Sequence, residues 1–233
     1  MAVMAAVSSN RFLKGKRLMS YNIVYRGGSG EIVEKKSRFI AQVFSVSTQE
    51  EAVEIIEQTK KKYWDARHNC HAFVIGENGE TTRCSDDGEP AGTAGRPMLE
   101  VLTGRDIRNV LVIVTRYFGG TLLGTGGLVR AYSQATKAGL DASVVVEKMS
   151  GRKTIIETDY NGIGKLQYIA RSMELTEMDT QYSDKVVMTI LVPEDRRAEL
   201  AKKVTEATAA QAVINDDEQV FFAIVDGEPV ILE

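Results

Sequence analysis

The chain has 233 residues, 43% hydrophobic and 26% charged, which suits one large globular domain or two small ones. Its 29 Lys and Arg against 32 Asp and Glu give a formal charge of −3, which excludes a protein that is basic over its whole surface. Two cysteines, Cys70 and Cys84, are too few for a disulfide framework, and no apolar run approaches the roughly 18 residues of a membrane span. We therefore expect a cytoplasmic protein with no membrane anchor.

The first residues do not resemble an export signal. The apolar run from Met1 to Val7 is too short, and the nearby basic residues follow it instead of preceding it. A strand-like segment begins directly after Met19. Residues 1–18 are therefore expected to be a disordered or non-native extension outside the fold.

The charge distribution divides the chain near Met149-Ser150-Gly151. Residues 1–150 carry 20 basic and 16 acidic side chains, a net charge of +4, whereas residues 151–233 carry 9 and 16, a net charge of −7. This asymmetry, with a short polar stretch between two apolar strands, predicts a domain boundary. We expect an N-terminal domain at 19–148 and a C-terminal domain at 152–233.

The N-terminal domain begins with strand and helix patterns. Strands are expected at 23–26 and at 37–45, the second continuing from the EIVEKK segment before it. Ser47 and Glu50 have the spacing of a capping box, which predicts the start of a helix. That helix is expected to end at the three lysines 60–62, whose positive charge suits a helix C-terminus.

Further along, the Asn78-Gly79 dipeptide favours a two-residue hairpin turn. Pro97 suits the first residue of a short helix that ends at Gly104. The segment NVLVIVTRYF (109–118) is apolar on both faces, as in a central strand that is covered on both sides. An apolar stripe from Gly127 onward predicts a helix, so the N-terminal domain is expected to be α+β.

The second half predicts the order strand, helix, strand, strand, helix, strand, which is the ferredoxin-like βαββαβ pattern. These elements are expected at 154–158, 162–172, 176–182, 186–192, 194–209 and 220–225. RNA-recognition domains of this topology have aromatic residues on a central strand, whereas KVVMTILV here has none. Because this half is also acidic, we expect it to contact a protein partner or to pack against the first domain.

A window without acidic residues lies between Asp106 and Asp141. At the whole-chain rate of 32 acids in 233 residues, its 34 positions would hold about five. The window contains a glycine-rich segment between a buried strand and a helix, where backbone N–H groups and the helix N-terminus attract anions. Arg130 is expected in the first helical turn, where a cation is disfavoured unless an anion is bound nearby.

We therefore predict a site for an anion such as a nucleic-acid phosphate. Its candidate residues are Arg116, Gly119, Gly120, Gly124, Gly126, Gly127 and Arg130. The spacing matches neither the Walker A motif nor GxGxxG, so the common nucleotide-binding folds are not supported. The alternative is that these glycines serve tight turns and close packing of the helix on the sheet.

A second candidate is the acidic loop formed by Asp86, Asp87 and Glu89. Three neighbouring carboxylates could hold Mg²⁺ or act as a general acid and base. Alternatively, they neutralise the arginines of the acid-free window or form a turn. Because no metal-ligand spacing and no nucleophile accompany them, we expect no metal, no cofactor and no catalytic residue here.

His68, Cys70, His71 and Cys84 suggest a zinc site by residue type. A two-residue turn at Asn78-Gly79 would place Cys84 on the same face as His71, with His68 and Cys70 on the other face. Four ligands on opposite faces of one hairpin cannot converge on a metal ion.

Four segments resemble a known family: KKSRFIA (35–41), DARHNCHAF (65–73), SDDGEPAGTAGRPML (85–99) and NVLVIVTRYFGGTLLGTGGLVRAYS (109–133). They are similar to the IMPACT family, in its bacterial YigZ/YvyE type. The resemblance implies an N-terminal domain like domain 2 of ribosomal protein S5 and a ferredoxin-like C-terminal domain. For bacterial members it also implies binding to nucleic acid or ribosomes, which is an argument by fold analogy.

Three functions remain open. In the first, a non-enzymatic translation regulator binds RNA or ribosomal phosphate through Arg116, Arg130 and the glycine turn at 119–127, while the C-terminal domain contacts a protein. In the second, the acidic loop belongs to an enzyme that acts on an anionic small molecule. In the third, the protein is an adaptor between other proteins. An enzyme needs these acids and arginines around one cleft, whereas an RNA-binding protein tolerates an open face.

Overall fold

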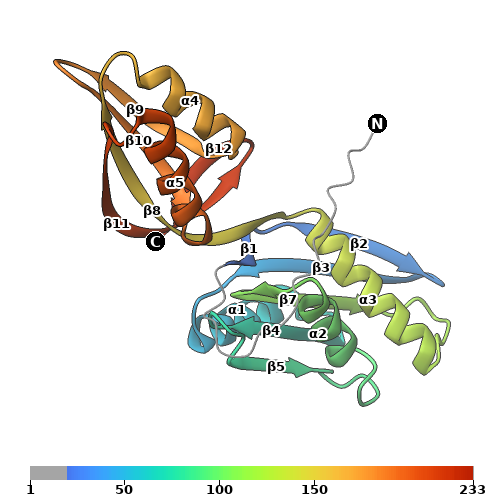
Figure 1. Ribbon diagram of the computed structural model, residues 1–233. Coiled ribbons are helices and arrows are strands. Elements are labelled where there is room, and N and C mark those ends of the chain that lie inside the picture. The colour runs from blue at the N-terminus through green and yellow to red at the C-terminus, as the bar shows by residue number, and fades with distance from the viewer. Residues whose placement is uncertain (1–19, 233) are drawn as a thin grey trace.

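The computed structural model describes residues 20–232, so the predicted extension at 1–18 lies outside the described residues. Two α+β domains lie along an elongated molecule (Figure 1), which confirms the predicted fold class. One five-stranded sheet belongs to the N-terminal domain, and a seven-stranded sheet extends from there into the C-terminal domain. None of the helices between residues 20 and 232 is both long and apolar enough to cross a membrane.

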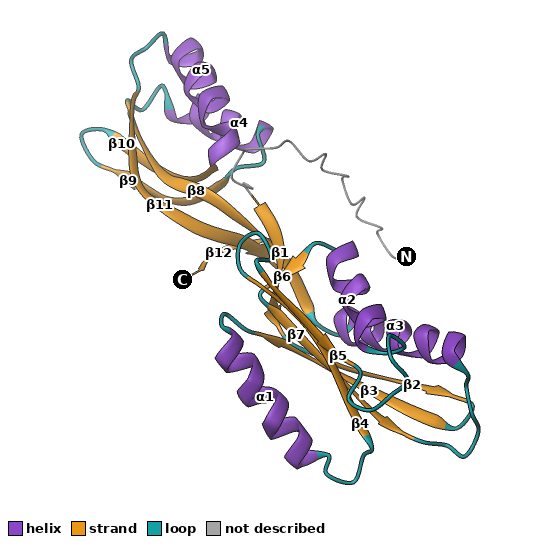
Figure 2. Cartoon of the chain, turned by 90° about the horizontal axis from the view of Figure 1, so that it is seen from below, coloured by secondary structure: helices purple, strands orange, loops and turns teal. Residues whose placement is uncertain are grey.

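The five-stranded sheet is antiparallel throughout and has helices on both faces. Its strands in spatial order are β2 (Ser29–Glu34), β3 (Ser37–Ser45), β7 (Val110–Tyr117), β4 (His68–Ile75) and β5 (Thr81–Ser85). Helix α1 (Gln49–Lys62) covers one face, while α2 (Gly95–Gly104) and α3 (Thr125–Asp141) cover the other (Figure 2).

The central strand β7 explains why both faces are covered. Val110, Val112 and Val114 are fully buried in the core beneath α2 and α3, whereas Leu111 and Ile113 are fully buried beneath α1. Burying each such side chain contributes roughly 1.5–3 kcal/mol, so exposing either face would be costly. The prediction of a covered central strand is confirmed.

The sequence predicted that the EIVEKK segment continues into the strand at 37–45, and this prediction is wrong. Lys35 and Lys36 both have positive φ angles, of 45° and 67°, and turn the chain back so that β2 pairs with β3. Two consecutive residues with positive φ are typical of the tight turns that suit the twist of a hairpin. Alternation alone does not reveal a turn built from two lysines.

Two helix starts also differ by one or two residues from the predictions. The N-cap of α1 is Thr48, whose hydroxyl accepts the N–H of Glu51, and Glu51 accepts the N–H of Ser47 in return. The capping box is therefore real but lies one residue later than Ser47 and Glu50. Helix α2 begins at Gly95, which makes Pro97 its third residue, still within the first turn where no N–H donor is needed.

The C-terminal domain has the predicted ferredoxin-like order. Its elements are β8 (Val144–Thr158), α4 (Ile163–Ser172), β9 (Thr176–Tyr182), β10 (Val186–Pro193), the 3₁₀ turn η1 (Glu194–Arg196), α5 (Arg197–Thr208) and β11 (Val213–Val225). The strands lie in the order β11-β8-β10-β9, and α4 and α5 cover one face. A further strand that was not predicted from the sequence, β12 (Glu228–Leu232), pairs with β11.

A single strand, β8, connects the two domains (Figure 1). Its first part pairs with β1 (Ser20–Arg26), which also pairs with the short β6 (Ile107–Arg108), and its second part pairs with β10. The polar Met149-Ser150-Gly151 stretch was expected to separate two strands, and that expectation is wrong. Gly151 lets neighbouring strands approach closely, because a Cβ there would lie 2.5 Å from the carbonyl oxygen of Val192.

We expect Gly151→Ala to lower the free energy of unfolding by about 1–3 kcal/mol, because the added Cβ would overlap Val192 and the Phe222 ring. Gly164→Ala is the matched control. Position 164 lies in α4 with nothing within 4 Å, so alanine should raise the free energy of unfolding by up to about 1 kcal/mol. Urea denaturation measures both, and equal effects would contradict this account of Gly151.

Candidate nucleic-acid interface

Four connections meet at the end of the N-terminal domain that lies away from the C-terminal domain (Figure 2). The Tyr117 hydroxyl donates to Asp65 at 2.9 Å, which joins the α1–β4 connection to β7. The Gly119 N–H donates to the Ser37 hydroxyl at 3.1 Å, which joins the β7–α3 connection to the β2–β3 turn. We call this surface the distal end, and it comprises residues 34–37, 63–68, 86–93 and 118–130.

Gly119 is required by close packing. A Cβ at this position would lie 2.0 Å from the backbone carbon of Lys36, and no side chain can be accommodated there. This contact brings the β7–α3 loop directly beside the turn that carries Lys35 and Lys36. Gly119 therefore has the role that the sequence offered as the alternative to anion binding, which is close packing.

Three of the other four glycines, Gly120, Gly124 and Gly126, leave their backbone accessible. Gly120 and Gly124 have positive φ angles, of 86° and 72°, and space is open around both. Gly124 is the N-cap of α3, and Gly126 lies in the exposed first turn. A side chain at Gly127 would meet Leu123 at 3.0 Å. The start of a 17-residue helix is thus uncovered on its outer side, which is the arrangement that suits an anion.

Arg116 does not face the solvent. Its side chain is 8% exposed and forms a 2.6 Å ion pair with Glu89, whose side chain is 3% exposed. The guanidinium also lies over the rings of Phe39 and Phe118, at 5.3 and 5.7 Å. The Tyr132 hydroxyl of α3 donates to the same Glu89 oxygen at 2.8 Å. Arg116 and Glu89, predicted for two different sites, therefore form one buried cluster.

Arg130 lies in the second turn of α3 and not in the first, because the helix begins at Thr125, two residues before Gly127. Its side chain is exposed, and its guanidinium lies near Gly126. The structure thus separates the two predicted arginines, one buried in an ion pair and the other open to solvent beside the start of the helix.

Asp86 holds the acidic loop against the start of α2. Its carboxylate accepts the backbone N–H groups of Gly92, Ala94 and Gly95 at 2.7–2.9 Å. Partial burial acts to raise the pKa of Asp86, but the three N–H donors outweigh it, so the pKa is lowered. This is the capping that α2 otherwise lacks, since its N-cap Ala94 has no side-chain oxygen.

Asp87 also has partners within the protein. It accepts the N–H of Asn69 at 2.7 Å and forms a 3.0 Å ion pair with Lys60. Its φ of 41°, followed by 87° at Gly88, produces the tight turn that the alternative for the acidic loop predicted. With Glu89 paired to Arg116, each carboxylate of the loop has a structural partner. Among residues 20–232, no three His, Cys, Asp or Glu side chains are grouped closely enough to hold a metal ion.

The cysteine and histidine pattern has a different register from the expected one. Cys84 pairs with Ala72, so it shares a face with Cys70 and not with His71. The reason is that residues 76–80 form the connection, which is longer than the two-residue turn expected at Asn78-Gly79. Burial raises the pKa of the Cys70 thiol to about 12, so the thiol stays protonated and is a weak nucleophile at neutral pH.

Several exposed residues of the distal end were not predicted from the sequence. Lys35 and Lys36 are exposed because they form a turn, and Arg67 is exposed at the start of β4. Phe118 and Leu122 are 51% and 83% exposed, although both belong to an apolar stretch of the sequence. The sequence signal for the exposure of Phe118 and Leu122 was their position directly before or between glycines. Loops rich in glycine lie on the surface and seldom cover large side chains.

Comparisons with known proteins agree with this architecture. The family model of the Impact N-terminal domain matches residues 35–140, and that of a domain of unknown function (DUF1949) matches residues 156–211. The IMPACT family member YvyE of Bacillus subtilis is 42% identical over 201 residues, which cover 86% of this chain and 93% of YvyE. The chain belongs to the IMPACT family.

A further curated relative and two solved structures are also similar to this chain. YigZ of Escherichia coli is 33% identical over 174 residues, covering 74% of this chain and 85% of YigZ. A solved structure described as a hypothetical protein is 30% identical with a TM-score of 0.55 and covers 86% of this chain and 98% of its own. A structure described as the two-domain translational regulator Yih1 is 26% identical with a TM-score of 0.36, over 60% of this chain and 56% of that one.

We expect Arg116→Met to lower the free energy of unfolding of this IMPACT-family protein by about 3–5 kcal/mol, because Glu89 would remain buried without a counter-charge. The double variant Arg116→Met/Glu89→Gln should recover part of that loss. Arg38→Met is the control, because the Arg38–Glu31 pair is exposed and should contribute less than about 1 kcal/mol. Urea denaturation of the single and double variants gives a double-mutant cycle. If the losses of unfolding free energy at positions 116 and 89 are purely additive, the two residues are not energetically coupled.

We expect Asp86→Asn to remove part of the pH dependence of stability. Because the folded-state pKa of Asp86 is lowered, its carboxylate stabilises the fold above the unfolded pKa of about 3.9 and loses this contribution as the pH falls through the folded pKa. Asp86→Asn should therefore cost about 0.5–2 kcal/mol at pH 6.5 and progressively less toward pH 3. The exposed Asp226→Asn serves as the control in denaturation at both pH values, and a constant difference would contradict the assignment.

Proposed function

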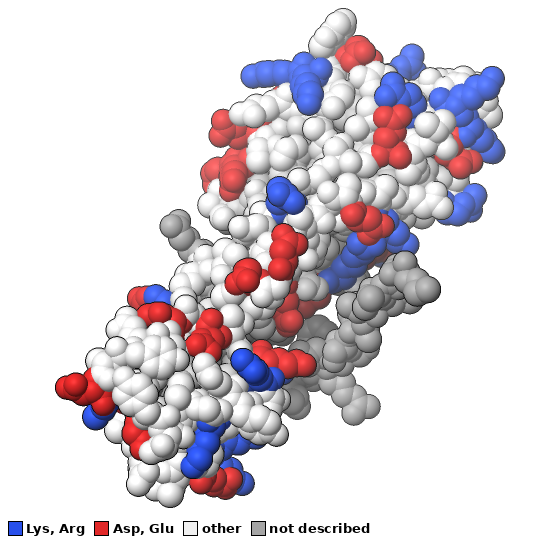
Figure 3. All heavy atoms as spheres, turned by 90° about the horizontal axis from the view of Figure 1, so that it is seen from above, with Lys and Arg blue, Asp and Glu red and all other residues white. Residues whose placement is uncertain are grey.

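We propose that the distal end binds RNA or ribosomal phosphate and that this binding serves a regulatory role in translation. The proposal rests on a group of exposed cations around the solvent-accessible start of α3. Its members are Lys35, Lys36, Arg67 and Arg130. Figure 3 shows Lys and Arg side chains gathered at this end of the molecule.

Charge supports an anionic partner. The exposed acids of the same connections are Glu34 and Asp65, and Asp65 is engaged by Tyr117, so the cations are in excess. The helix start adds about half a positive charge, and the backbone at Gly124 and Gly126 allows close approach. Since residues 19–150 balance at 16 basic and 16 acidic side chains, the attraction is confined to this patch.

Exposed apolar side chains extend the same surface. Phe118 lies in the β7–α3 loop and Trp64, which is 82% exposed, lies in the α1–β4 connection beside Tyr117. Aromatic rings stack on unpaired bases irrespective of sequence, and each stacked base contributes about 1–3 kcal/mol. Cations near accessible aromatic rings are typical of surfaces that bind single-stranded nucleic acid.

The carboxylate partners argue against the enzyme alternative. General acid and base catalysis requires carboxylates that reach a substrate together with the arginines. Here Glu89 is buried against Arg116, while Asp86 and Asp87 hold backbone N–H groups and Lys60. A binding surface of exposed cations uses none of these groups.

We expect the full chain to bind a single-stranded RNA of about 20 nucleotides, or purified bacterial ribosomes, with an affinity that falls steeply with salt. Four phosphate contacts on a single strand give a slope of about −3 for log K against log salt concentration. Lys36→Glu/Arg130→Glu should weaken binding at least tenfold and reduce the slope by about 1.4. Fluorescence anisotropy and ribosome co-sedimentation measure both.

Arg171→Glu/Lys202→Glu is the control, because both residues are exposed in helices of the other domain and the pair carries the same change of charge. It should bind RNA like the unmodified protein. Circular dichroism verifies that each variant is folded. If the unmodified protein binds neither probe at 50 mM salt, or if both variants weaken binding equally, the proposal is wrong.

A further inference from the structure

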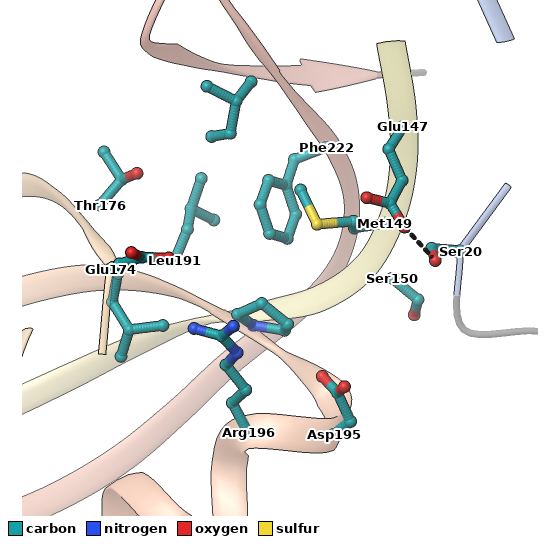
Figure 4. A pocket seen from close by; sticks show the side chains of 13 residues that line it. Ser20, Glu147, Met149, Ser150, Glu174, Thr176, Leu191, Asp195, Arg196 and Phe222 are labelled. Atoms are coloured by element: carbon teal, nitrogen blue, oxygen red, sulfur yellow. Dashed lines mark hydrogen bonds between the residues drawn. The ribbon is translucent and has the colours of Figure 1, made fainter. Parts of the chain in front are cut away.

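A pocket of about 320 Å³, which we call the junction pocket, lies where β1 and β8 meet the C-terminal domain. Its floor is formed by Met149, Leu191 and Phe222, which pack together on the sheet face opposite to α4 and α5. Figure 4 shows these three side chains toward the middle of the pocket. Ile224 also lines it and is 39% exposed. The pocket therefore presents apolar surface whose removal from water by another molecule is favourable.

The rim of the junction pocket is acidic. Glu147, Glu174 and Asp195 line it, and all three residues are exposed. None of these carboxylates takes part in the ion pairs formed among residues 20–232. The one cation in the described lining is Arg196, whose guanidinium donates to the carbonyl oxygen of Met173. Three carboxylates and one guanidinium give the lining a net charge of −2.

The position of the charges around the floor indicates what the pocket fits. Figure 4 shows Glu147 and Asp195 on one side of the apolar side chains and Glu174 on the other. Apolar surface edged by polar groups is typical of sites that contact other proteins. We propose that the junction pocket binds a segment of another protein in which basic residues flank a large apolar one. The apolar side chain lies against Phe222, and the basic side chains reach the carboxylates of the rim.

Size and charge disfavour other occupants. A volume of about 320 Å³ is near the lower end of the range for ligand pockets, so it accommodates one or two side chains. The phosphates of a nucleic acid would be repelled by the three carboxylates. In a symmetric dimer the same surface of each copy meets the other, so a second copy would place these carboxylates opposite one another.

The junction pocket depends on both parts of the shared sheet. Glu147 and Met149 come from the segment of β8 that pairs with β1, whereas Leu191 and Phe222 come from β10 and β11 of the C-terminal domain. The pocket is also separate from the cations of the distal end. A protein segment in the pocket and an anion at the distal end therefore bind to the same molecule without competing.

A defined peptide tests the pocket in the full chain. The probe is a fluorescein-labelled peptide of eight residues, with a Phe-Leu pair at its centre and lysines on both sides. We expect saturable binding in fluorescence anisotropy, with a dissociation constant below about 1 mM. Peptides with glutamate in place of lysine, or with serine in place of the Phe-Leu pair, should bind about tenfold more weakly or less. If the probe does not bind, or if the serine peptide binds equally well, the proposal is overturned.

Variants of the rim locate the binding. Glu174→Lys/Asp195→Lys should weaken binding of the probe about tenfold or more, because the rim would then repel the lysines. Asp179→Lys/Asp184→Lys is the charge-matched control, since both residues are exposed in the same domain and neither lines the pocket. It should change the affinity by less than about twofold, because screening limits the reach of exposed charges. Equal weakening by both pairs would mean that the whole acidic domain attracts the peptide, which contradicts a site in the pocket.

A variant of the floor tests the apolar contact. Ile224→Ser should weaken binding of the probe about threefold or more, because apolar surface is lost at an exposed position of the pocket. Val33→Ser, at a residue that is 62% exposed in β2, is the control and should bind the probe like the unmodified protein. Circular dichroism verifies that each variant is folded. An unchanged affinity in the Ile224 variant would rule out the apolar contact.

Sedimentation velocity distinguishes a second copy from another protein as the occupant. We expect the full chain to remain a monomer with and without the probe. If it instead self-associates with rising concentration and Glu174→Lys/Asp195→Lys abolishes this association, the pocket is an interface between copies of this chain and the proposal is wrong.

Discussion

The buried ion pair between Arg116 and Glu89 holds the distal end together. Arg116 comes from the central strand β7, Glu89 from the loop before α2, and Tyr132 of α3 donates to the same carboxylate oxygen. Burial of two charges is favourable only when geometry and additional hydrogen bonds compensate for lost hydration. Here the compensation comes from three elements at once, so their relative positions are coupled.

That coupling determines which groups remain free. Glu89 pairs with Arg116 of β7, and the Asp86 carboxylate accepts the N–H of Gly95 at the start of α2, so the acidic loop fixes the positions of these elements. The cations that take part in neither interaction, above all Lys36 and Arg130, are exposed around the β7–α3 loop. The same residues that would suggest a catalytic loop thus position the exposed cations on which the proposed binding of an anion depends.

The continuous strand β8 imposes a second constraint. It pairs with β1 in one domain and with β10 and β11 in the other, so the two domains share one hydrogen-bonded sheet. A shared strand resists independent rotation of the domains far better than a flexible linker does. The distal end of the N-terminal domain is therefore held at a fixed position relative to the C-terminal domain.

The sequence by itself determined the features that depend on local pattern. The doubly covered strand β7, the ferredoxin-like order of the second half and the family followed from apolar periodicity and from motifs such as RYFGG and SDDGEP. Only the tertiary structure decided the roles of the charged residues. Arg116 and Glu89 lie 27 positions apart and read as members of separate sites, whereas Lys35 and Lys36 read as part of a strand. Burial, pairing and exposure are set by contacts between distant segments, which local sequence patterns do not encode.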